Sequence, residues 1–310
     1  MNYEAVGRWM RHITLAVLFL MLVAACATSQ WAIAWSAVPG RIGEPVSTVA
    51  TTPLDASNPP DVRLAVLGDV GTGSQDEWET AALAAGAGEN HPFDGLVLLG
   101  DNVYPSGDPD RLQATVFDPF DPILRRGTPL LPVLGNHDVK DGNAVGQAEA
   151  LGMPGRWYAT EMGPLLLVSL DSNLVDDMAQ LRWLESTLAA GGTEWVIVTM
   201  HHPPFSAGYH GSDDDIQETW VPLFEAYGVD LVLSGHDHDY QRTVPINGIT
   251  YVVSGGGART RPTERAEFTA FAASTLHFVD ITIWGERLEL TAVNSNGAFD
   301  HVVIERSGSP

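Results

Sequence analysis

The sequence predicts an α/β fold: a two-sheet β-sandwich flanked by helices, formed by a single domain over residues 61–306. Three observations lead to this prediction. Short apolar runs repeatedly end in Gly-Asp, Gly-Asn or His, apolar residues recur at helical spacing between some of these runs, and the C-terminal part has strand-like composition. A chain of 310 residues is long enough to bury a substantial core.

The apolar runs predict strands that are buried on both faces. Each run is continuous instead of alternating between apolar and polar residues, which is typical of strands covered on both sides. In chain order they are RLAVLGD (63–69), GLVLLGD (95–101), PLLPVLGNHD (129–138), WVIVTMHH (195–202) and VDLVLSGHDH (229–238). Open α/β folds bind ligands beyond the carboxyl ends of their strands, so the polar residues that close these runs are the first candidates for a functional site.

Helices and further strands are predicted between and after these runs. Residues 177–190 predict a helix, because leucines recur on one face: Leu181, Leu184 and Leu188. Residues 218–228 predict a second helix with Gly228 as its C-cap. Three later stretches predict strands, since they are rich in β-branched and aromatic residues and lack a helical period: 278–284, 287–294 and 301–305.

Residues 1–26 predict a signal peptide. The apolar run of residues 13–25 follows basic residues and is shorter than the roughly 20 residues needed to span a bilayer. It ends at Cys26 in VAAC, which resembles a bacterial lipobox, so we expect a protein that is exported and lipid-anchored to the bacterial cell envelope through Cys26. The alternative is an uncleaved anchor that continues through residues 31–35. Residues 27–60 are rich in proline, glycine, serine and threonine and predict a flexible tether.

The composition is strongly acidic. A formal net charge of −23, with only 16 Lys and Arg, opposes nucleic-acid binding, because neutralising phosphates requires clustered basic side chains. Nucleic acid is therefore not expected as a primary partner. The same charge would repel small phosphate compounds unless bound cations reverse the field locally. Because the chain has one cysteine, an intramolecular disulfide cannot stabilise it.

The loops after the apolar runs supply the ligand types that a pair of metal ions requires. A dinuclear site needs a bridging carboxylate, further oxygen and imidazole ligands, and open positions for water and substrate. The loops are GDVG (68–71), GDNVY (100–104), GNHD (135–138), VTMHH (198–202) and GHDH (235–238). A single motif of this kind occurs by chance in loops, but five in this order, each closing an apolar run, form a specific pattern. We therefore predict a metal site at these strand ends.

The order GDxG, GDxxY, GNH(D/E), VxxH and GHxH resembles the calcineurin-like metallophosphoesterases, and GDxxY resembles their purple acid phosphatase branch. The resemblance covers most of residues 63–294 and implies a metallophosphatase-type fold for the metallophosphoesterase domain at 61–306. It implies two metal ions per chain: iron(III) and a divalent ion, which is iron, zinc or manganese. The implied ligands of the first ion are Asp69, Asp101, Tyr104 and His238. Those of the second are Asp101, Asn136, His201 and His236, with Asp101 bridging.

The resemblance also implies a reaction. His137 and His210 match substrate-contacting positions, whereas Asp138, where the family more often has Glu, is not expected to bind metal. We expect a phosphoester hydrolase of the acid phosphatase type that acts on small phosphate monoesters. Metal-bound hydroxide would attack phosphorus, while His210 or His137 protonates or hydrogen-bonds the leaving oxygen.

Several alternatives stay open at this point. The same metals could serve a phosphodiesterase or nucleotide hydrolase, or the chain could be a catalytically silent surface lipoprotein that binds metal or phosphate. His202 could support the ligands or only pack against them. The run Gly255–Gly257 lacks the spacing of a nucleotide-binding loop and predicts close backbone packing near the site. Arg259 and Arg261 follow this run, and because exposed loop arginines are common, we do not expect them to bind substrate.

Overall fold

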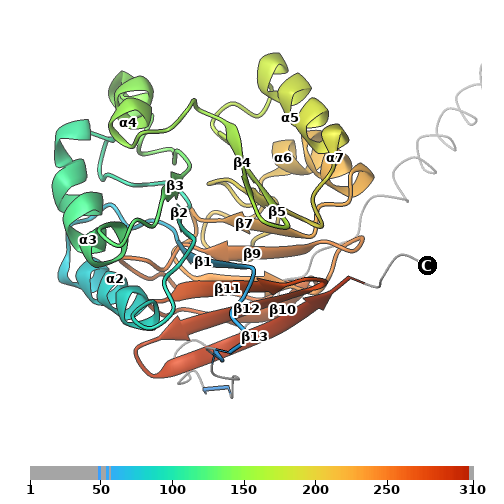
Figure 1. The fold of residues 1–310 in the computed structure, drawn as a ribbon. Coiled ribbons are helices and arrows are strands. Elements are labelled where there is room, and N and C mark those ends of the chain that lie inside the picture. Colours follow the sequence, from blue (N-terminus) through green and yellow to red (C-terminus); the bar gives the residue numbers. More distant parts are fainter. Residues whose placement is uncertain (1–47, 50–53, 56, 307–310) are drawn as a thin grey trace, which may run out of the picture. The chain divides into compact units, whose positions relative to one another are not determined.

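A computed structural model of the chain describes residues 48–49, 54–55 and 57–306, and its strands form two sheets (Figure 1). The strands are β1 Val62–Leu67, β2 Gly95–Leu98, β3 Leu130–Pro132, β4 Tyr158–Met162, β5 Leu165–Ser169, β6 Trp195–Thr199, β7 Leu231–Ser234, β8 Tyr240–Thr243, β9 Thr250–Ser254, β10 Thr269–Ala273, β11 Phe278–Trp284, β12 Arg287–Asn294 and β13 Gly297–Glu305. The helices are α2 Gln75–Ala87, α3 Asp118–Leu124, α4 Ala144–Ala150, α5 Met178–Ala190, α6 Asp214–Thr219 and α7 Val221–Ala226. Short helical turns lie at Pro109–Arg111, Gln113–Phe117 and Lys140–Gly142.

The first sheet has the strand order β13-β12-β11-β1-β2-β3. Strands β1, β2 and β3 are parallel, with Leu64 opposite Gly95 and Leu96 opposite Leu130, while β11, β12 and β13 are antiparallel. The second sheet has the order β10-β8-β9-β7-β6-β5-β4, and its central strands β5, β6, β7 and β9 are parallel. Each sheet therefore places the carboxyl ends of several neighbouring strands at one edge, which is the place for a ligand site.

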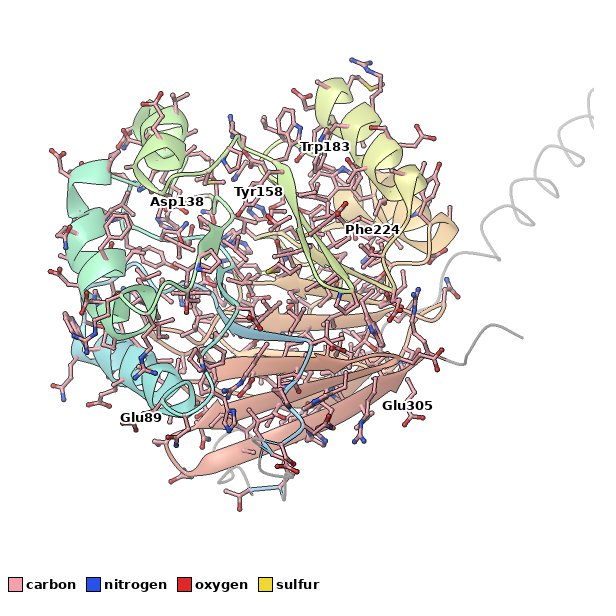
Figure 2. All side chains as sticks on the ribbon, in the orientation of Figure 1. Glu89, Asp138, Tyr158, Trp183, Phe224 and Glu305 are labelled. Atoms are coloured by element: carbon pink, nitrogen blue, oxygen red, sulfur yellow. The ribbon has the colours of Figure 1, made fainter. Side chains whose placement is uncertain are left out.

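Three apolar clusters explain why the two sheets and the helices pack in layers. One joins the facing sides of both sheets and includes Val66, Leu167 and Leu233. The second lies between the first sheet and the helices α2 and α3, and the third between the second sheet and the helices α5, α6 and α7. Figure 1 shows these two groups of helices on opposite flanks, and Figure 2 shows the side chains that fill the layers, including Phe224 of α7. The predicted two-sheet sandwich flanked by helices is confirmed.

Strands form at all of the apolar runs that the sequence analysis singled out. β1, β2, β6 and β7 are buried almost throughout, as continuous apolar runs predict. The first predicted helix is α5, where Leu184 and Leu188 are buried and Leu181 is partly buried against the same cluster. The sequence analysis did not predict α2, β8, β9 or β10. For α2 a local signal was present, because the side chain of the N-cap residue Ser74 accepts from the Glu77 N–H.

The prediction of one continuous helix over residues 218–228 is wrong. The structure has two short helices instead of one, with α6 ending at Thr219 and α7 beginning at Val221. Pro222 explains the break, because it has no N–H to donate to the preceding turn and its ring crowds that turn. Gly228 follows α7 with a φ of +68°, as expected for a residue that ends a helix.

The predictions for the N-terminus lie mostly outside the described residues. Cys26, the signal peptide and most of the 27–60 tether are in the part that the structure does not describe, so they stay predictions. Of the tether, the Val49 N–H donates to the Ala298 carbonyl of β13 at 2.7 Å. Among the described helices, none combines the length and apolar character needed to cross a bilayer.

Candidate metal centre

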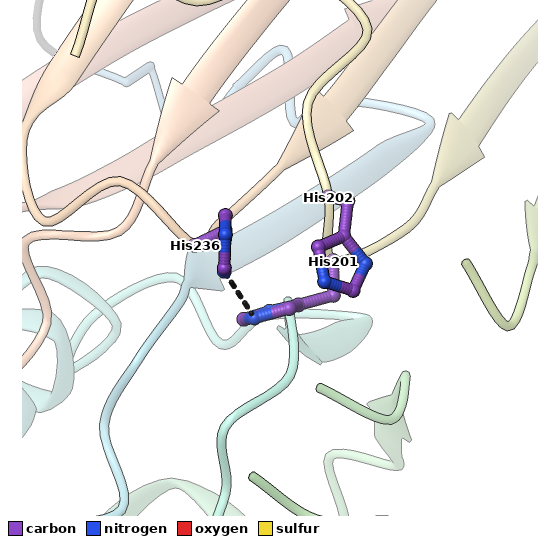
Figure 3. Close-up of side chains that lie close together, drawn as sticks. All are labelled: His201, His202 and His236. Atoms are coloured by element: carbon purple, nitrogen blue, oxygen red, sulfur yellow. Dashed lines mark hydrogen bonds between the residues drawn. The ribbon is translucent and has the colours of Figure 1, made fainter. Parts of the chain in front are cut away.

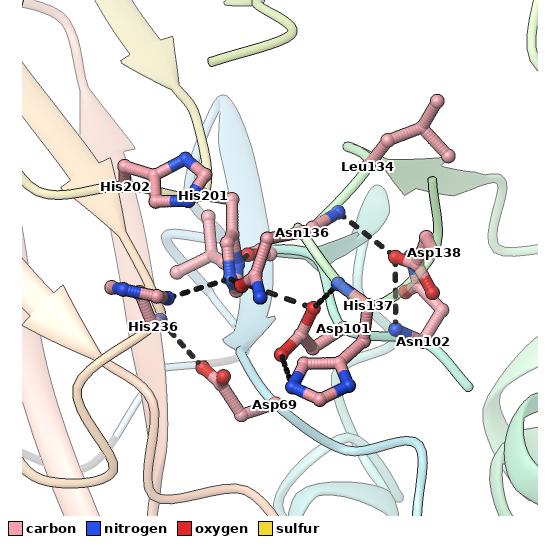
Figure 4. A network of polar contacts seen from close by, with 12 residues as sticks. Asp69, Asp101, Asn102, Leu134, Asn136, His137, Asp138, His201, His202 and His236 are labelled. Carbon is pink, nitrogen blue, oxygen red and sulfur yellow. Dashed lines mark hydrogen bonds and ion pairs between the residues drawn. The ribbon is translucent and has the colours of Figure 1, made fainter. Parts of the chain in front are cut away.

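The loops that follow β1, β2, β3, β6 and β7 meet at one edge of the two sheets. Backbone hydrogen bonds join them directly: Asp69 N–H donates to the Gly100 carbonyl at 3.0 Å, and Gly235 N–H donates to the His201 carbonyl at 3.0 Å. The His236 N–H in turn donates to Asp69 Oδ2 at 2.8 Å. Residues that are far apart in the sequence are thus held within one small volume, as Figure 4 shows.

Three of the predicted ligands have unfavourable backbone conformations. Asp69, Asp101 and His236 have φ values of +59°, +53° and +72°, in the left-handed region that residues other than glycine rarely adopt. Such conformations cost on the order of 1–3 kcal/mol each and persist only where the surrounding structure enforces them. At this site the strained backbone turns three polar side chains toward a common centre.

The glycines of these loops allow the close approach. A Cβ atom on Gly135 would lie 2.2 Å from Asp101 Oδ1, and one on Gly235 would lie 2.6 Å from Asp69 Oδ2. Any larger residue at either position would push a carboxylate out of place. The run Gly255–Gly257 has the same function, since a Cβ on Gly255 would lie 2.1 Å from the Asp237 carbonyl oxygen. The predicted close packing of this run is confirmed.

On the side of the centre formed by Asn136, His201 and His236, several polar atoms lie close to His201 Nε2. His201 Nδ1 donates to the Leu99 carbonyl at 2.8 Å, so its Nε2 presents a lone pair. This Nε2 lies 3.0 Å from Asn136 Oδ1, 3.2 Å from His236 Nδ1 and 3.5 Å from Asp101 Oδ1 (Figures 3 and 4). Of these three atoms only His236 Nδ1 can supply a hydrogen, so the arrangement brings together more lone pairs than hydrogens.

The second side of the centre consists of Asp69, Tyr104 and His238. The Tyr104 hydroxyl donates to Asp69 Oδ1 at 3.0 Å and lies 3.1 Å from His238 Nε2. His238 Nε2 also lies 3.4 Å from Asp69 Oδ1, while its Nδ1 is buried without a hydrogen-bond partner. Three different chemical groups thus direct their polar atoms at one point.

Burial shifts the pKa values of these groups in the direction that favours their neutral forms. Burial, followed by the neighbouring charge of Asp101, raises the pKa of Asp69 well above its usual value. Burial also lowers the pKa of His201 well below the ordinary value, that of His236 to about 2 and that of His238 to about 4. The imidazoles are therefore neutral and able to bind metal at any physiological pH.

This donor set fits metal ions. Asp69, Asp101 and His201 each present a ligand atom within 4.8 Å of the others, and so do His201, His202 and His236. A cation between such atoms would satisfy the crowded lone pairs of His201 and Asp101 and would offset the charge of the buried carboxylates. All seven predicted ligands lie in this region: Asp69, Asp101, Tyr104, Asn136, His201, His236 and His238.

The two histidines predicted to contact substrate lie beside the donor set. His137 donates its N–H to Asp101 Oδ1 at 2.8 Å, and its ring centroid lies 4.6 Å from that of Tyr104. The His210 ring stacks on His236 at 4.1 Å between centroids. Both line a pocket of about 410 Å³ together with Asp101, Tyr104, Asn136, His236 and His238. The pocket is the route by which a substrate can reach the ligands.

The sequence analysis left the role of His202 open and did not expect Asp138 to bind metal. His202 has its Nδ1 2.8 Å from Ser172 Oγ, and its ring centroid lies 4.6 Å from that of His236 (Figure 3). Asp138 is fully buried and accepts hydrogen bonds from the N–H groups of Asn102, Val103 and Gly135. Asp138 therefore joins two ligand loops and has little capacity left for a metal, as predicted.

Asp237 is a buried residue of the candidate site that the sequence reasoning missed. It is fully buried, and its Oδ1 accepts from His210 N–H at 2.8 Å and lies 3.0 Å from His210 Nδ1. Its Oδ2 accepts from Ser206 Oγ at 2.5 Å. A signal was present, since Asp237 stands between His236 and His238 in GHDH. Its partner His210 is 27 residues away, however, and local sequence does not connect them.

Comparisons with known proteins agree with this geometry. A model of the family described as calcineurin-like phosphoesterase matches residues 62–240. The tartrate-resistant acid phosphatase type 5 of Mus musculus is 30% identical over 262 residues, which cover 71% of this chain and 78% of that protein.

Two solved structures share the fold. GAP50, described as the anchor in the inner membrane complex of Plasmodium, superposes with a TM-score of 0.68 at 19% identity, over 79% of this chain and 88% of that one. The purple acid phosphatase PPD1 of yellow lupin superposes with a TM-score of 0.64 at 20% identity, over 80% of this chain and 54% of that one.

Proposed function

Because the chain belongs to the calcineurin-like phosphoesterase family and has tartrate-resistant and purple acid phosphatases as homologues, we propose that it hydrolyses small phosphate monoesters at a two-metal site. The observation that carries the proposal is the surplus of lone pairs over hydrogens around His201 Nε2, which lies beside the ligands that line the pocket. A bound cation would satisfy these lone pairs.

The residues divide between two ions. Asp69, Asp101, Tyr104 and His238 would hold one ion, and Asp101, Asn136, His201 and His236 would hold the other. The phenol of Tyr104 is a hard oxygen donor, which suits iron(III), whereas the imidazoles and the amide suit divalent iron, zinc or manganese. When bound, such ions act as Lewis acids that offset phosphate charge and make water a better nucleophile near neutral pH.

His210 is placed to handle the proton of the leaving group. Its Nδ1 faces the buried carboxylate of Asp237, and its Nε2 lines the pocket 3.2 Å from Arg261 Nη1, so Nε2 can donate to a substrate once Arg261 turns toward that substrate. The Asp237 carboxylate fixes the ring orientation and stabilises the protonated imidazole, which is the form that donates a proton to a leaving oxygen. His137 lines the same pocket beside Tyr104 and can donate a hydrogen bond to the phosphoryl group.

A second function is favoured by one observation, the likeness to GAP50, whose description is that of an anchor. The fold alone is therefore compatible with a surface protein that binds metal or phosphate without catalysis. The exported, lipid-anchored location remains part of our proposal and would suit either function. A phosphodiesterase on the same residues is the nearest catalytic alternative.

Hydrolysis of nitrophenyl phosphate and of bis-nitrophenyl phosphate, with metal analysis of the same sample, separates these possibilities. We expect about two metal ions per chain and a clear preference for the monoester. Asp101→Asn should abolish the activity, whereas Asp110→Asn, at an exposed position of a helical turn, should keep it. Two bound ions without hydrolysis of either ester would favour the anchor function, and a preference for the diester would favour a phosphodiesterase.

A further inference from the structure

Two arginines, Arg259 and Arg261, line the same pocket as the metal ligands. The Arg259 guanidinium lies over the ring of Tyr104, 5.0 Å from its centroid. The Arg261 guanidinium lies 4.8 Å from the centroid of Tyr209, and its Nη1 is 3.2 Å from Nε2 of His210. Both arginines therefore lie beside the candidate site, although the sequence analysis did not expect them to bind substrate.

The backbone that carries these arginines is fastened to the site. The Arg261 N–H donates to the His238 carbonyl at 2.8 Å, and the Arg261 carbonyl accepts from Ser274 Oγ at 2.7 Å. The preceding Gly257 N–H donates to the Gly68 carbonyl at 3.1 Å, and Ala258 is buried. These contacts hold the segment against the loops that carry Asp69 and His238, so the guanidinium groups stay at the pocket mouth.

Neither guanidinium has an acidic partner in the described part of the chain. The ion pairs of the described arginines involve other positions, such as Arg63 with Asp280, Arg156 with Asp171 and Arg242 with Asp300. Arg259 and Arg261 thus bring two positive charges without a carboxylate partner to one pocket of a chain whose net charge is −23. Arg111 also lines the pocket, but its guanidinium donates a hydrogen bond to the Tyr104 carbonyl.

The position of the two charges indicates what they bind. Arg259 lies beside Tyr104 and Arg261 beside His210, in the same pocket as the metal ligands, which would hold one phosphoryl group. Guanidinium groups recognise phosphate and carboxylate through paired hydrogen bonds, and stacking on an aromatic ring pre-orients them for this contact. A group bound there would belong to the part of the substrate that leaves.

We propose that Arg259 and Arg261 form an anion subsite that selects phosphate monoesters carrying a second anionic group, phosphoryl or carboxylate, on the leaving portion. This inference rests on the proposed function for the reaction itself. It goes further by assigning a substrate class and two residues that determine specificity. The bare metal site would not distinguish between a neutral and an anionic leaving portion.

Two matched substrate pairs test the subsite. Fructose 1,6-bisphosphate and fructose 1-phosphate differ by one phosphoryl group, and 3-phosphoglycerate and glycerol 3-phosphate differ by one carboxylate. The wild type should have a higher kcat/KM for the doubly anionic member of at least one pair, and the pair that shows the larger preference identifies the second group. Arg259→Gln should reduce this preference about tenfold, as expected for loss of a hydrogen bond to a charged group. Its kcat/KM for the singly anionic member should fall by a smaller factor.

Arg265→Gln is the matched control. It removes the same charge from the same segment, but Arg265 does not line the pocket and donates to the Ala270 carbonyl instead. Equal preference in the wild type and in Arg259→Gln, or the same loss in Arg265→Gln, would overturn the proposal. Calorimetric titration of the metal-loaded protein with each pair gives the same comparison by binding alone. A protein that hydrolyses no ester yet binds the doubly anionic member more tightly through Arg259 would refute the proposed function and support the subsite.

Discussion

Removing the charge of Asp101 should change the stability of the protein in opposite directions with and without metal. Asp101 is 2% exposed and Asp69 is fully buried, and ligand atoms of the two carboxylates lie within 4.8 Å of each other. Asp101→Asn keeps the shape of the side chain and the oxygen that accepts from His137 N–H, but removes the negative charge. The substitution therefore tests the charge of the site apart from its packing.

The magnitude follows from that distance. Two unit charges 4.8 Å apart repel by about 3 kcal/mol at an effective dielectric constant of 20. The raised pKa of Asp69 allows partial protonation, which relieves part of this repulsion. Asp101→Asn should therefore stabilise the metal-free protein by about 1–3 kcal/mol, and each kcal/mol corresponds to roughly 2–4 °C in Tm for a domain of this size. When one ion is present at a hundredfold excess over its Kd, its binding instead stabilises the wild type by about 2.7 kcal/mol. The variant does not bind the ion and is not stabilised in this way.

Thermal unfolding followed by circular dichroism, with and without chelator, measures both states at neutral pH. The variant should melt above the wild type after chelation and below it in excess metal, and metal analysis should find that both ions are lost. Asp110→Asn should melt with the wild type in each condition. A variant that melts below the wild type in chelator would refute the charge repulsion, and a variant that retains two ions would show that Asp101 does not bridge two cations.

Four further predictions use independent measurements. Tyr104→Phe should abolish the visible absorption band that a phenolate on iron(III) gives to the purified protein, and a colourless wild type active with two zinc or manganese ions would contradict the assignment of iron(III) to Tyr104. His210→Ala should keep its metal content but lose roughly 100-fold or more in kcat for poor leaving groups and less for activated ones, and equal losses would exclude proton donation. Burial raises the pKa of Glu77 from 4.5 to about 7, so the wild type should lose up to roughly 3 kcal/mol of stability relative to Glu77→Gln as the pH rises from 4.5 to 7. Denaturant titrations across this range measure the difference, and a constant difference would mean that Glu77 stays ionised. Cys26→Ser should prevent incorporation of labelled fatty acid, and equal labelling of wild type and variant would favour an uncleaved anchor.

The sequence alone was sufficient for the fold class and for bringing out the residues of the candidate metal centre. Continuous apolar runs such as residues 95–98 determine that β2 is buried on both faces, and a polar motif at the end of each parallel strand must lie at the same edge of its sheet. Both signals depend on neighbouring residues in the chain, so they can be recognised without the structure. The break at Pro222 was missed because the apolar pattern continues across it.

Only the tertiary structure decided which polar residues act together. The pairing of His210 with Asp237, the contact between His201 Nδ1 and the Leu99 carbonyl, and the position of Arg259 over Tyr104 each join distant segments. No periodicity or local motif encodes such contacts, because they depend on how two sheets pack face to face. The same packing gives an acidic chain a pocket with two arginines that lack acidic partners, a feature that its net charge alone would have argued against.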